Sequence, residues 1–124
     1  MIRLDKSGKI HLSETDVQRQ CVDLMEAHGW RMIRTGYGEI IKGGRVVGTV
    51  GEVGMPDYQA IYYTDYWAAT KVVWIEFKRP KAKGVRGGKR SAEQTLWSDA
   101  ERKRGAIVLQ IDSLEQLIKE IRKL

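Results

Sequence analysis

Two runs rich in aromatic and β-branched residues, separated by a turn-prone polar interval, place the strongest constraint on the fold. They cover residues 57–63, beginning at Asp57, and residues 72–78. These residue types favour strands, and the short interval allows the two strands to pair as a hairpin. Alternation puts Glu76 and Lys78 on one face of the second strand, and pairing brings Asp57 beside them. We therefore expect two carboxylates and one ammonium group at one edge of a sheet.

This group of side chains suits a metal-dependent hydrolysis of phosphodiesters. Mg²⁺ binds a few carboxylate oxygens and keeps several waters, which leaves coordination positions for phosphate oxygens. A bound divalent ion lowers the pKa of its water and neutralises charge in the transition state. A nearby Lys can orient the attacking water and stabilise developing negative charge. We expect Asp57 and Glu76 to bind Mg²⁺ or Mn²⁺ and Lys78 to position the water.

The same residues match the pattern of a known family. Gly54-Met55-Pro56-Asp57, followed by Glu76-Phe77-Lys78, resembles the PD-(D/E)xK nuclease signature. Glu14, at the start of the first expected helix, and Gln94-Thr95-Leu96-Trp97, at the start of a later one, narrow the resemblance. Taken in order, these motifs resemble a stand-alone VRR-NUC domain of the compact kind found in phages and bacteria. The resemblance covers residues 13–111.

The resemblance implies a fold, an activity and a set of site residues. The fold would be one nuclease domain over residues 1–124, an α/β, restriction-endonuclease-like core with a central mixed β-sheet flanked by helices. The backbone carbonyl of Phe77 would join Asp57 and Glu76 at the metal, and Glu14 (directly or through water) and Gln94 would complete the site. The activity would be that of a homodimeric DNA endonuclease, selective for branched DNA such as Holliday junctions. A flap nuclease, an exonuclease or a restriction-type enzyme remains an alternative, as does a non-catalytic DNA-binding accessory module for recombination.

Glu14 and Gln94 also have purely structural explanations. Glu14 is spaced with Val17 and Cys21 to face inward, toward the sheet, but an acid also stabilises the positive end of a helix. Ser91 and Gln94 have the spacing of a capping box, in which the glutamine caps the helix without any role in catalysis. Capping is compatible with proximity to the site.

The net charge of +6 is unevenly distributed along the chain. Residues 78–104 hold ten Lys and Arg against three acids, a net of +7, while the remainder has a net of −1. Excess positive charge directly after the carboxylate strand favours a polyanionic partner, although a solvated basic loop is the simpler alternative. The candidate DNA-binding residues are Arg79, Lys81, Lys83, Arg86, Lys89, Arg90, Lys42 and Arg45.

Residues 36–54 contain seven glycines, which indicates a bent or adaptable backbone. Two interpretations remain open for this segment. The apolar pairs Ile40-Ile41 and Val46-Val47 could form a ribbon around Gly43-Gly44, but we favour a segment that orders only when substrate binds. The glycine spacing does not match a phosphate-binding loop that ends in Gly-Lys-Ser/Thr.

The remaining patterns complete an α/β domain. We expect a helix over residues 13–28, a strand over 30–34, a helix from Ser91 to Gly105, a strand over 106–111 and a final amphipathic helix. Trp97 is expected to pack in the core rather than stack on a base. One cysteine in 124 residues excludes an intrachain disulfide, and no apolar run is long enough to span a membrane. These features predict a soluble, cytoplasmic protein.

Overall fold

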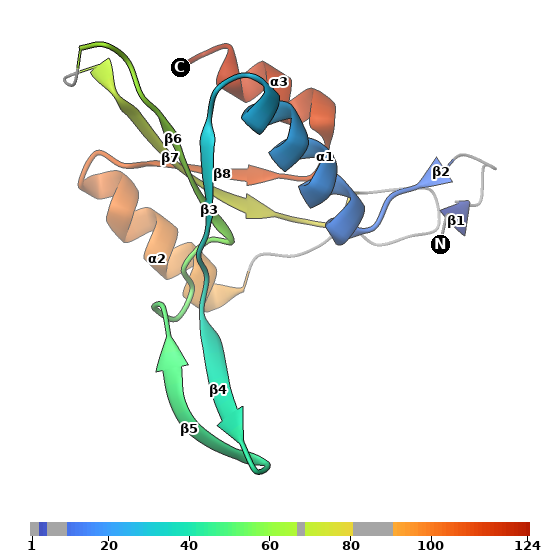
Figure 1. Cartoon of the computed structure of the whole chain (residues 1–124), viewed down its shortest axis with the longest axis vertical. Helices are drawn as coiled ribbons and strands as arrows, with labels where there is room; N and C mark the ends of the chain where they lie inside the picture. The colour runs from blue at the N-terminus through green and yellow to red at the C-terminus, as the bar shows by residue number, and fades with distance from the viewer. Residues whose placement is uncertain (1–2, 5–9, 67–68, 81–90) are drawn as a thin grey trace.

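The computed structural model describes residues 3–4, 10–66, 69–80 and 91–124. It is a mixed α/β structure with a mixed central sheet and three helices in the described residues (Figure 1). The elements in chain order are β1 (Arg3–Leu4), β2 (Ile10–His11), α1 (Glu14–Ala27), β3 (Arg31–Arg34), β4 (Gly38–Lys42), β5 (Arg45–Val50), β6 (Tyr58–Tyr62), β7 (Lys71–Phe77), α2 (Ala92–Lys103), β8 (Ile107–Ile111) and α3 (Leu114–Ile121). None of these helices is long and apolar enough to cross a bilayer.

The central sheet has the strand order β3-β6-β7-β8. Strands β6 and β7 form the expected antiparallel hairpin, with Tyr58 opposite Ile75, and β7 pairs with β8 in parallel. Helix α2 connects these two parallel strands along the chain. The carboxyl ends of β7 and β8 therefore lie at one edge of the sheet, where binding sites of open α/β sheets commonly form.

Alternation along β7 separates the hydrophobic core from the polar cluster. Val73, Ile75 and Phe77 are fully buried in a core cluster that includes Val17 of α1 and Leu117 of α3. This explains why α1 and α3 lie together on one side of the sheet (Figure 1).

The other face of β7 packs against α2. The Trp74 ring lies edge-on to the Trp97 ring, with centroids 5.1 Å apart. Trp97 is half-buried in this contact and lies outside the core cluster, so the expected position in the core is not what the structure has. Glu76 lies on this face too, and its side chain contacts Gln94 of the same helix.

Capping fixes the start of each helix. Ser13 and Asp16 form a capping box at α1, Ser91 and Gln94 form one at α2, and Ser113 caps α3. Helix α1 ends beside Gly29, which has a φ of +88°, as expected from the sequence.

Strands β4 and β5 form a separate two-stranded ribbon, which we call the β4–β5 arm (Figure 1). It turns at Gly43 and Gly44, whose φ angles are +58° and +75°. Such angles are typical of the two-residue hairpin turn that glycine permits. Of the two interpretations of residues 36–54, the structure has the ribbon.

Candidate functional site

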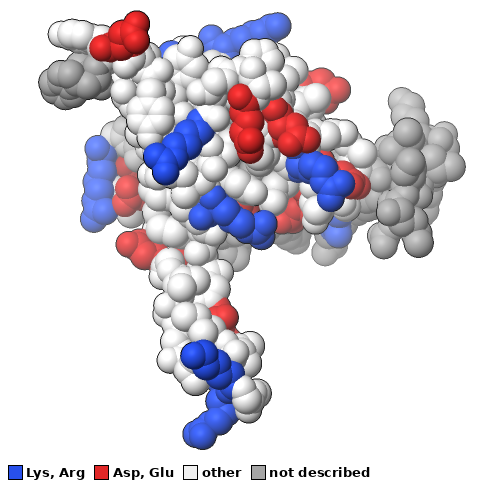
Figure 2. Space-filling view, in the orientation of Figure 1, with Lys and Arg blue, Asp and Glu red and all other residues white. Residues whose placement is uncertain are grey.

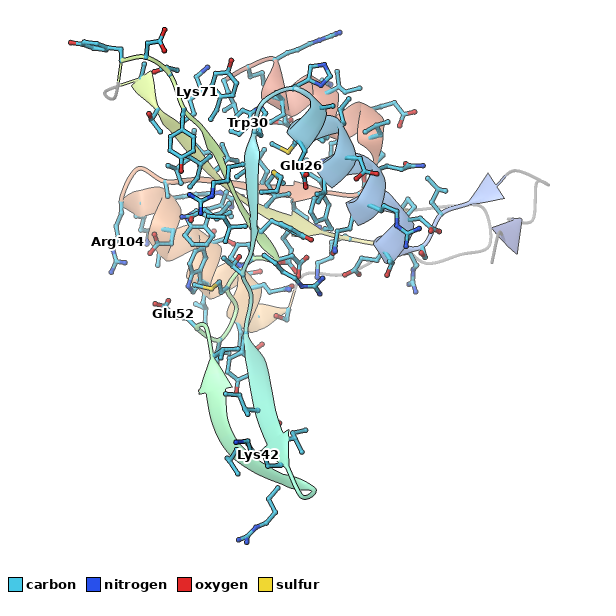
Figure 3. The ribbon with its side chains drawn as sticks, in the orientation of Figure 1. Glu26, Trp30, Lys42, Glu52, Lys71 and Arg104 are labelled. Atoms are coloured by element: carbon cyan, nitrogen blue, oxygen red, sulfur yellow. The ribbon has the colours of Figure 1, made fainter. Side chains whose placement is uncertain are left out.

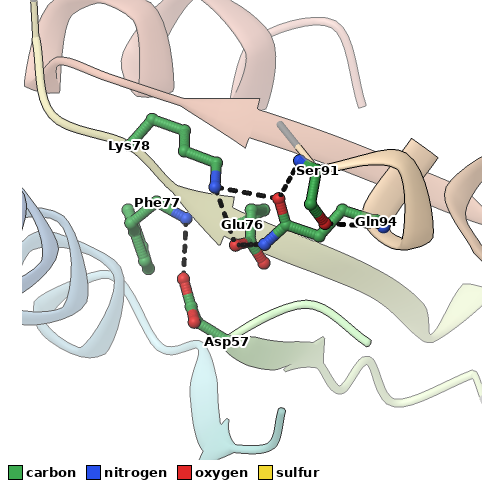
Figure 4. Close-up of polar contacts among 6 residues, drawn as sticks. All are labelled: Asp57, Glu76, Phe77, Lys78, Ser91 and Gln94. Carbon is green, nitrogen blue, oxygen red and sulfur yellow. Dashed lines mark hydrogen bonds and ion pairs between the residues drawn. The ribbon is translucent and has the colours of Figure 1, made fainter. Parts of the chain in front are cut away.

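Asp57 and Glu76 lie next to each other because of the register of the β6–β7 hairpin. Tyr58 pairs with Ile75, so one step beyond that pair Asp57 faces Glu76. The Asp57 Oδ2 atom accepts a hydrogen bond of 3.0 Å from the backbone N–H of Phe77 (Figure 4). This bond fixes the first carboxylate at the end of the second strand. The expected convergence of Asp57 with Glu76 and Lys78 is present.

Glu76 is a buried carboxyl group with one satisfied and one unsatisfied oxygen. The residue is only 4% exposed. Its Oε1 atom accepts a hydrogen bond from Gln94 Nε2 and forms an ion pair of 3.4 Å with Lys78 Nζ. Its Oε2 atom is buried and has no hydrogen-bond partner among the described residues. Unsatisfied buried carboxylate oxygens are costly, so this atom indicates a missing partner.

The charge of Glu76 is disfavoured by its surroundings. Burial raises the pKa of the Glu76 carboxyl from 4.5 to about 7, and the negative charge of Asp57 adds to the shift. The Lys78 ammonium group opposes this shift, and Glu14 adds a smaller upward effect on the Glu76 pKa. A positive charge near Oε2 would lower the pKa of Glu76 and favour its carboxylate form.

Lys78 points back into the same cluster. It is 8% exposed, and its Nζ atom donates a hydrogen bond of 2.9 Å to Gln94 Oε1. Its backbone N–H donates to the carbonyl of Ile111 in β8 at 2.9 Å. The parallel neighbour therefore holds the backbone from which the lysine side chain extends.

Gln94 combines the two roles that the sequence left open. The Gln94 Oε1 atom accepts a 2.9 Å hydrogen bond from the Ser91 backbone N–H, and the Gln94 backbone N–H donates to Ser91 Oγ at 3.1 Å. The same amide contacts both Lys78 and Glu76 (Figure 4). The capping box thus ties the start of α2 to the carboxylate cluster.

The cluster opens into a cleft of about 450 Å³. Its walls come from the end of β3, the base of the β4–β5 arm, the Gly54–Asp57 segment, β7 and the first turn of α2. The lining residues are Arg34, Thr35, Gly36, Tyr37, Gly38, Val50, Val53, Gly54, Met55, Asp57, Glu76, Ser91, Glu93 and Gln94. A cleft bounded by carboxylates, one arginine and a helix N-terminus can admit a phosphate group with a bound cation.

The donor set fits a hard divalent cation with few protein ligands. No group of three or more His, Cys, Asp or Glu side chains gathers as a metal site within the described ranges. Mg²⁺ needs only one or two carboxylates and keeps several waters. Asp57 and Glu76 both line the cleft, and Glu76 Oε2 is the oxygen without a partner among the described residues. Phe77 directly follows Glu76 on β7, and its backbone N–H donates to Asp57.

Glu14 does not face inward as its spacing suggested. It is exposed in the first turn of α1, and in the described structure no hydrogen bond or ion pair joins it to Asp57 or Glu76. Val17, three residues further along α1, is fully buried in the core, so the covered part of this face begins there and not at Glu14. The charge of Glu14 still raises the pKa of Glu76, and a contact of Glu14 with a cation, directly or through water, stays a prediction.

The expected DNA-binding residues fall into three groups. Arg79 is half-buried directly after Lys78, beside the site. Lys42 and Arg45 are exposed and pair at the turn of the β4–β5 arm, and Figure 3 shows Lys42 near the free end of the arm. The other five lie outside the described residues, namely Lys81, Lys83, Arg86, Lys89 and Arg90.

The position of Arg34 and Tyr37 in the cleft wall, and a hydrogen bond between Trp97 and Glu52, were not predicted from the sequence. Arg34 and Tyr37 line the cleft because β3 pairs with β6, with Arg34 opposite Tyr58. A basic residue at a strand end was visible in the sequence, but its strand partner was not. The Trp97 Nε1 atom donates a 2.8 Å hydrogen bond to Glu52, which ties α2 to the segment between the arm and Asp57.

Comparisons of this chain with protein-family models, curated proteins and solved structures found no match. The resemblance to VRR-NUC nucleases therefore depends on the motifs alone, and the function is inferred from the geometry of the cleft.

Proposed function

We propose that this protein is a Mg²⁺- or Mn²⁺-dependent DNA endonuclease with a PD-(D/E)xK, VRR-NUC-like site. The observation that carries the proposal is the buried, unsatisfied Oε2 atom of Glu76, a residue that lines the cleft together with Asp57. A carboxyl group held where its charge is disfavoured makes sense if a bound cation, needed for hydrolysis, stabilises the carboxylate form. The motif order and the excess of basic residues support the same conclusion.

Each side chain has a role that follows from its contacts. Asp57, Glu76 and the backbone carbonyl of Phe77 would hold the cation, which lowers the pKa of a bound water and neutralises charge on the phosphate. Lys78 Nζ carries three hydrogens and has two partners, Gln94 and Glu76. The third hydrogen is left to orient the attacking water or to contact a phosphate oxygen. Gln94 holds Lys78 and Glu76 in their relative positions.

The partner is proposed to be DNA, with branched DNA such as a Holliday junction preferred. Arg34 in the cleft wall and the N-terminus of α2 both favour a phosphate at the carboxylates. The preference for a junction and the homodimer follow from the resemblance alone. A two-fold dimer would present two such sites to a two-fold junction.

A cleavage assay tests the proposal. Linear duplex, a 5′ flap and a four-way junction are incubated with the protein in Mg²⁺, in Mn²⁺ and in EDTA. We expect the junction to be cut fastest, in either metal ion, and nothing to be cut in EDTA. Cleavage of none of them would contradict the nuclease and favour a DNA-binding module. Equal cleavage of all three would contradict selectivity for branched DNA.

Variants separate chemistry from binding. Asp57→Ala and Lys78→Ala should each reduce cleavage by at least about a hundredfold, because each removes a group that acts on the transition state. Junction binding in Ca²⁺ should change little. The matched control is Lys71→Ala. Lys71 begins β7, at the end of that strand far from Lys78 and the cleft (Figure 3). Loss of junction binding in both site variants would mean that these residues shape the fold instead.

A further inference from the structure

The β4–β5 arm is fixed to the elements that carry the site. A Cβ atom on Gly36 would touch the Pro56 carbonyl, and one on Gly51 would collide with the Gly36 carbonyl. The returning chain is held to α2 by the Trp97–Glu52 hydrogen bond of 2.8 Å. The base of the arm therefore packs against the segment that ends in Asp57, and its strands begin in the wall of the cleft.

The surface of the arm is unusual for a free protein surface. Its aliphatic side chains are exposed on both sides of the ribbon, and Ile41, Val46 and Val47 are each 57–62% exposed. Its tip carries Lys42 and Arg45, which pair across the turn. Figure 2 shows Lys and Arg side chains gathered at the free end of the arm. Arg34 adds a third cation where the arm meets the cleft. A narrow ribbon with apolar sides and a cationic tip matches the groove of a nucleic-acid duplex.

The dimensions of the arm agree with this partner. A two-stranded ribbon fits the major groove, where aliphatic side chains can contact thymine methyl groups while the cations contact phosphates. The six residue steps from Gly36 to Lys42, four of them within β4, span at most about 20 Å at a strand's rise of about 3.3 Å per residue. Phosphates of one strand follow each other at about 3.4 Å along the duplex, so this length corresponds to about six nucleotides.

We propose that the β4–β5 arm binds double-stranded DNA on one side of the scissile phosphate, with Lys42 and Arg45 at phosphates about six nucleotides away. This inference rests on the proposed nuclease function, since the scissile phosphate is placed at Asp57 and Glu76. The arm then sets the length of duplex that the enzyme requires next to the cut.

The salt dependence of binding tests the contact. Junction binding is measured in Ca²⁺, between 50 and 200 mM salt, for the wild type and for Lys42→Ala/Arg45→Ala. Each lost phosphate contact lowers the slope of log K against log salt by about 0.9, so we expect a reduction of about 2. The matched control is Lys119→Ala/Lys123→Ala, which removes two cations on and just after α3. This helix lies at the opposite end of the view in Figure 1 from the arm, so the slope should stay near that of the wild type.

The position of the contact is tested with shortened substrates in Mg²⁺. Junctions whose duplex arms are shortened from twelve to three base pairs on each side of the cut should be cleaved at least about tenfold more slowly once one side falls below about six. The tip variant should lose this dependence on length. Equal salt slopes, or a tip variant with the wild-type length profile, would overturn the inference while leaving cleavage intact.

Other outcomes distinguish this inference from the proposed function. A wild type that binds DNA with an arm-dependent salt slope but cuts nothing would contradict the nuclease and support the arm as a DNA contact. A wild type that binds no DNA would overturn both. The variant Ile41→Thr/Val46→Thr tests the apolar side of the arm by sedimentation and by DNA binding. If it converts a dimer to a monomer without changing DNA binding, the arm is a self-association surface and the inference is overturned.

Discussion

Burial and the neighbouring Asp57 charge both oppose ionisation of Glu76, so its acid–base behaviour reports directly on the site. Its pKa rises to about 7 in the folded protein, against an ordinary value of 4.5. The folded state therefore binds the proton more tightly than the unfolded state does. In the absence of metal, stability should fall as the pH rises from about 4.5 to about 7, because the unfolded chain loses its proton first.

The expected size of this fall is roughly 3 to 4 kcal/mol in the free energy of unfolding, because the Glu76 pKa is about 2.5 higher in the folded than in the unfolded state and a difference of one corresponds to about 1.4 kcal/mol. Urea unfolding at pH 5 and pH 8 in EDTA measures it. Glu76→Gln cannot ionise and should remove most of this pH dependence. A wild-type protein that shows the same pH dependence as Glu76→Gln would mean that Glu76 ionises without cost.

Two variants separate the capping role of Gln94 from its contacts with Glu76 and Lys78. Ser91→Ala removes the cap but leaves Glu76 and Lys78 untouched, so we expect a loss of about 1 kcal/mol in stability and near-normal cleavage. Gln94→Glu keeps the acceptor for Ser91 N–H and for Lys78 but replaces the donor to Glu76 with a carboxylate. It should keep most of the stability and cut at least about tenfold more slowly. Equal cleavage by both variants would show that Gln94 acts only as a cap.

At the scale of elements, the loop before Asp57 is set by its contact with α2. Gly54 has a φ of +85°, and a Cβ atom there would collide with the Glu93 carbonyl. The glycine of the Gly-Met-Pro-Asp motif is thus needed for both conformation and close packing. Because Gly54 packs against the first turn of α2 in the cleft wall, that turn helps to position Asp57 three residues later.

Gly54→Ala should therefore cost more than backbone strain alone. Gly105 gives a matched control, because its φ is +95° and a Cβ atom there has nothing within 4 Å. Gly105→Ala should cost about 1–2 kcal/mol in the free energy of unfolding, the usual cost of a left-handed residue. Gly54→Ala should lose clearly more stability and also reduce cleavage. Similar losses of stability from the two substitutions would show that the contact with Glu93 relaxes easily.

At the scale of the whole molecule, the site was predictable wherever it depends on local pattern. The alternation along residues 72–78 and the short connection to residues 57–63 suffice to bring Asp57 to Glu76, because both are properties of neighbouring residues. The capping box at Ser91 likewise needs only a spacing of three. The structure confirms the hairpin and the capping box that these local patterns predicted.

Features that depend on which elements pack together were not predictable. The exposure of Glu14 depends on where α1 extends past its neighbours, and no helical spacing encodes that limit. The Trp97–Glu52 bond joins residues 45 positions apart and follows no periodic pattern. The glycines of residues 36–54 allowed either an ordered ribbon or a segment that orders on binding. The ribbon depends on its base packing against Asp57 and α2.

The central claim is that Asp57 and Glu76 together bind a divalent cation, and a Mn²⁺ titration followed by calorimetry tests it most directly. The wild type should bind Mn²⁺ and, near pH 6, release protons as Glu76 becomes a carboxylate, visible as heats that differ between buffers of different ionisation enthalpy. Asp57→Asn and Glu76→Gln should each lose this binding, while Lys71→Ala should retain it. Binding that persists unchanged in both carboxylate variants, or that is absent from the wild type, would contradict the account.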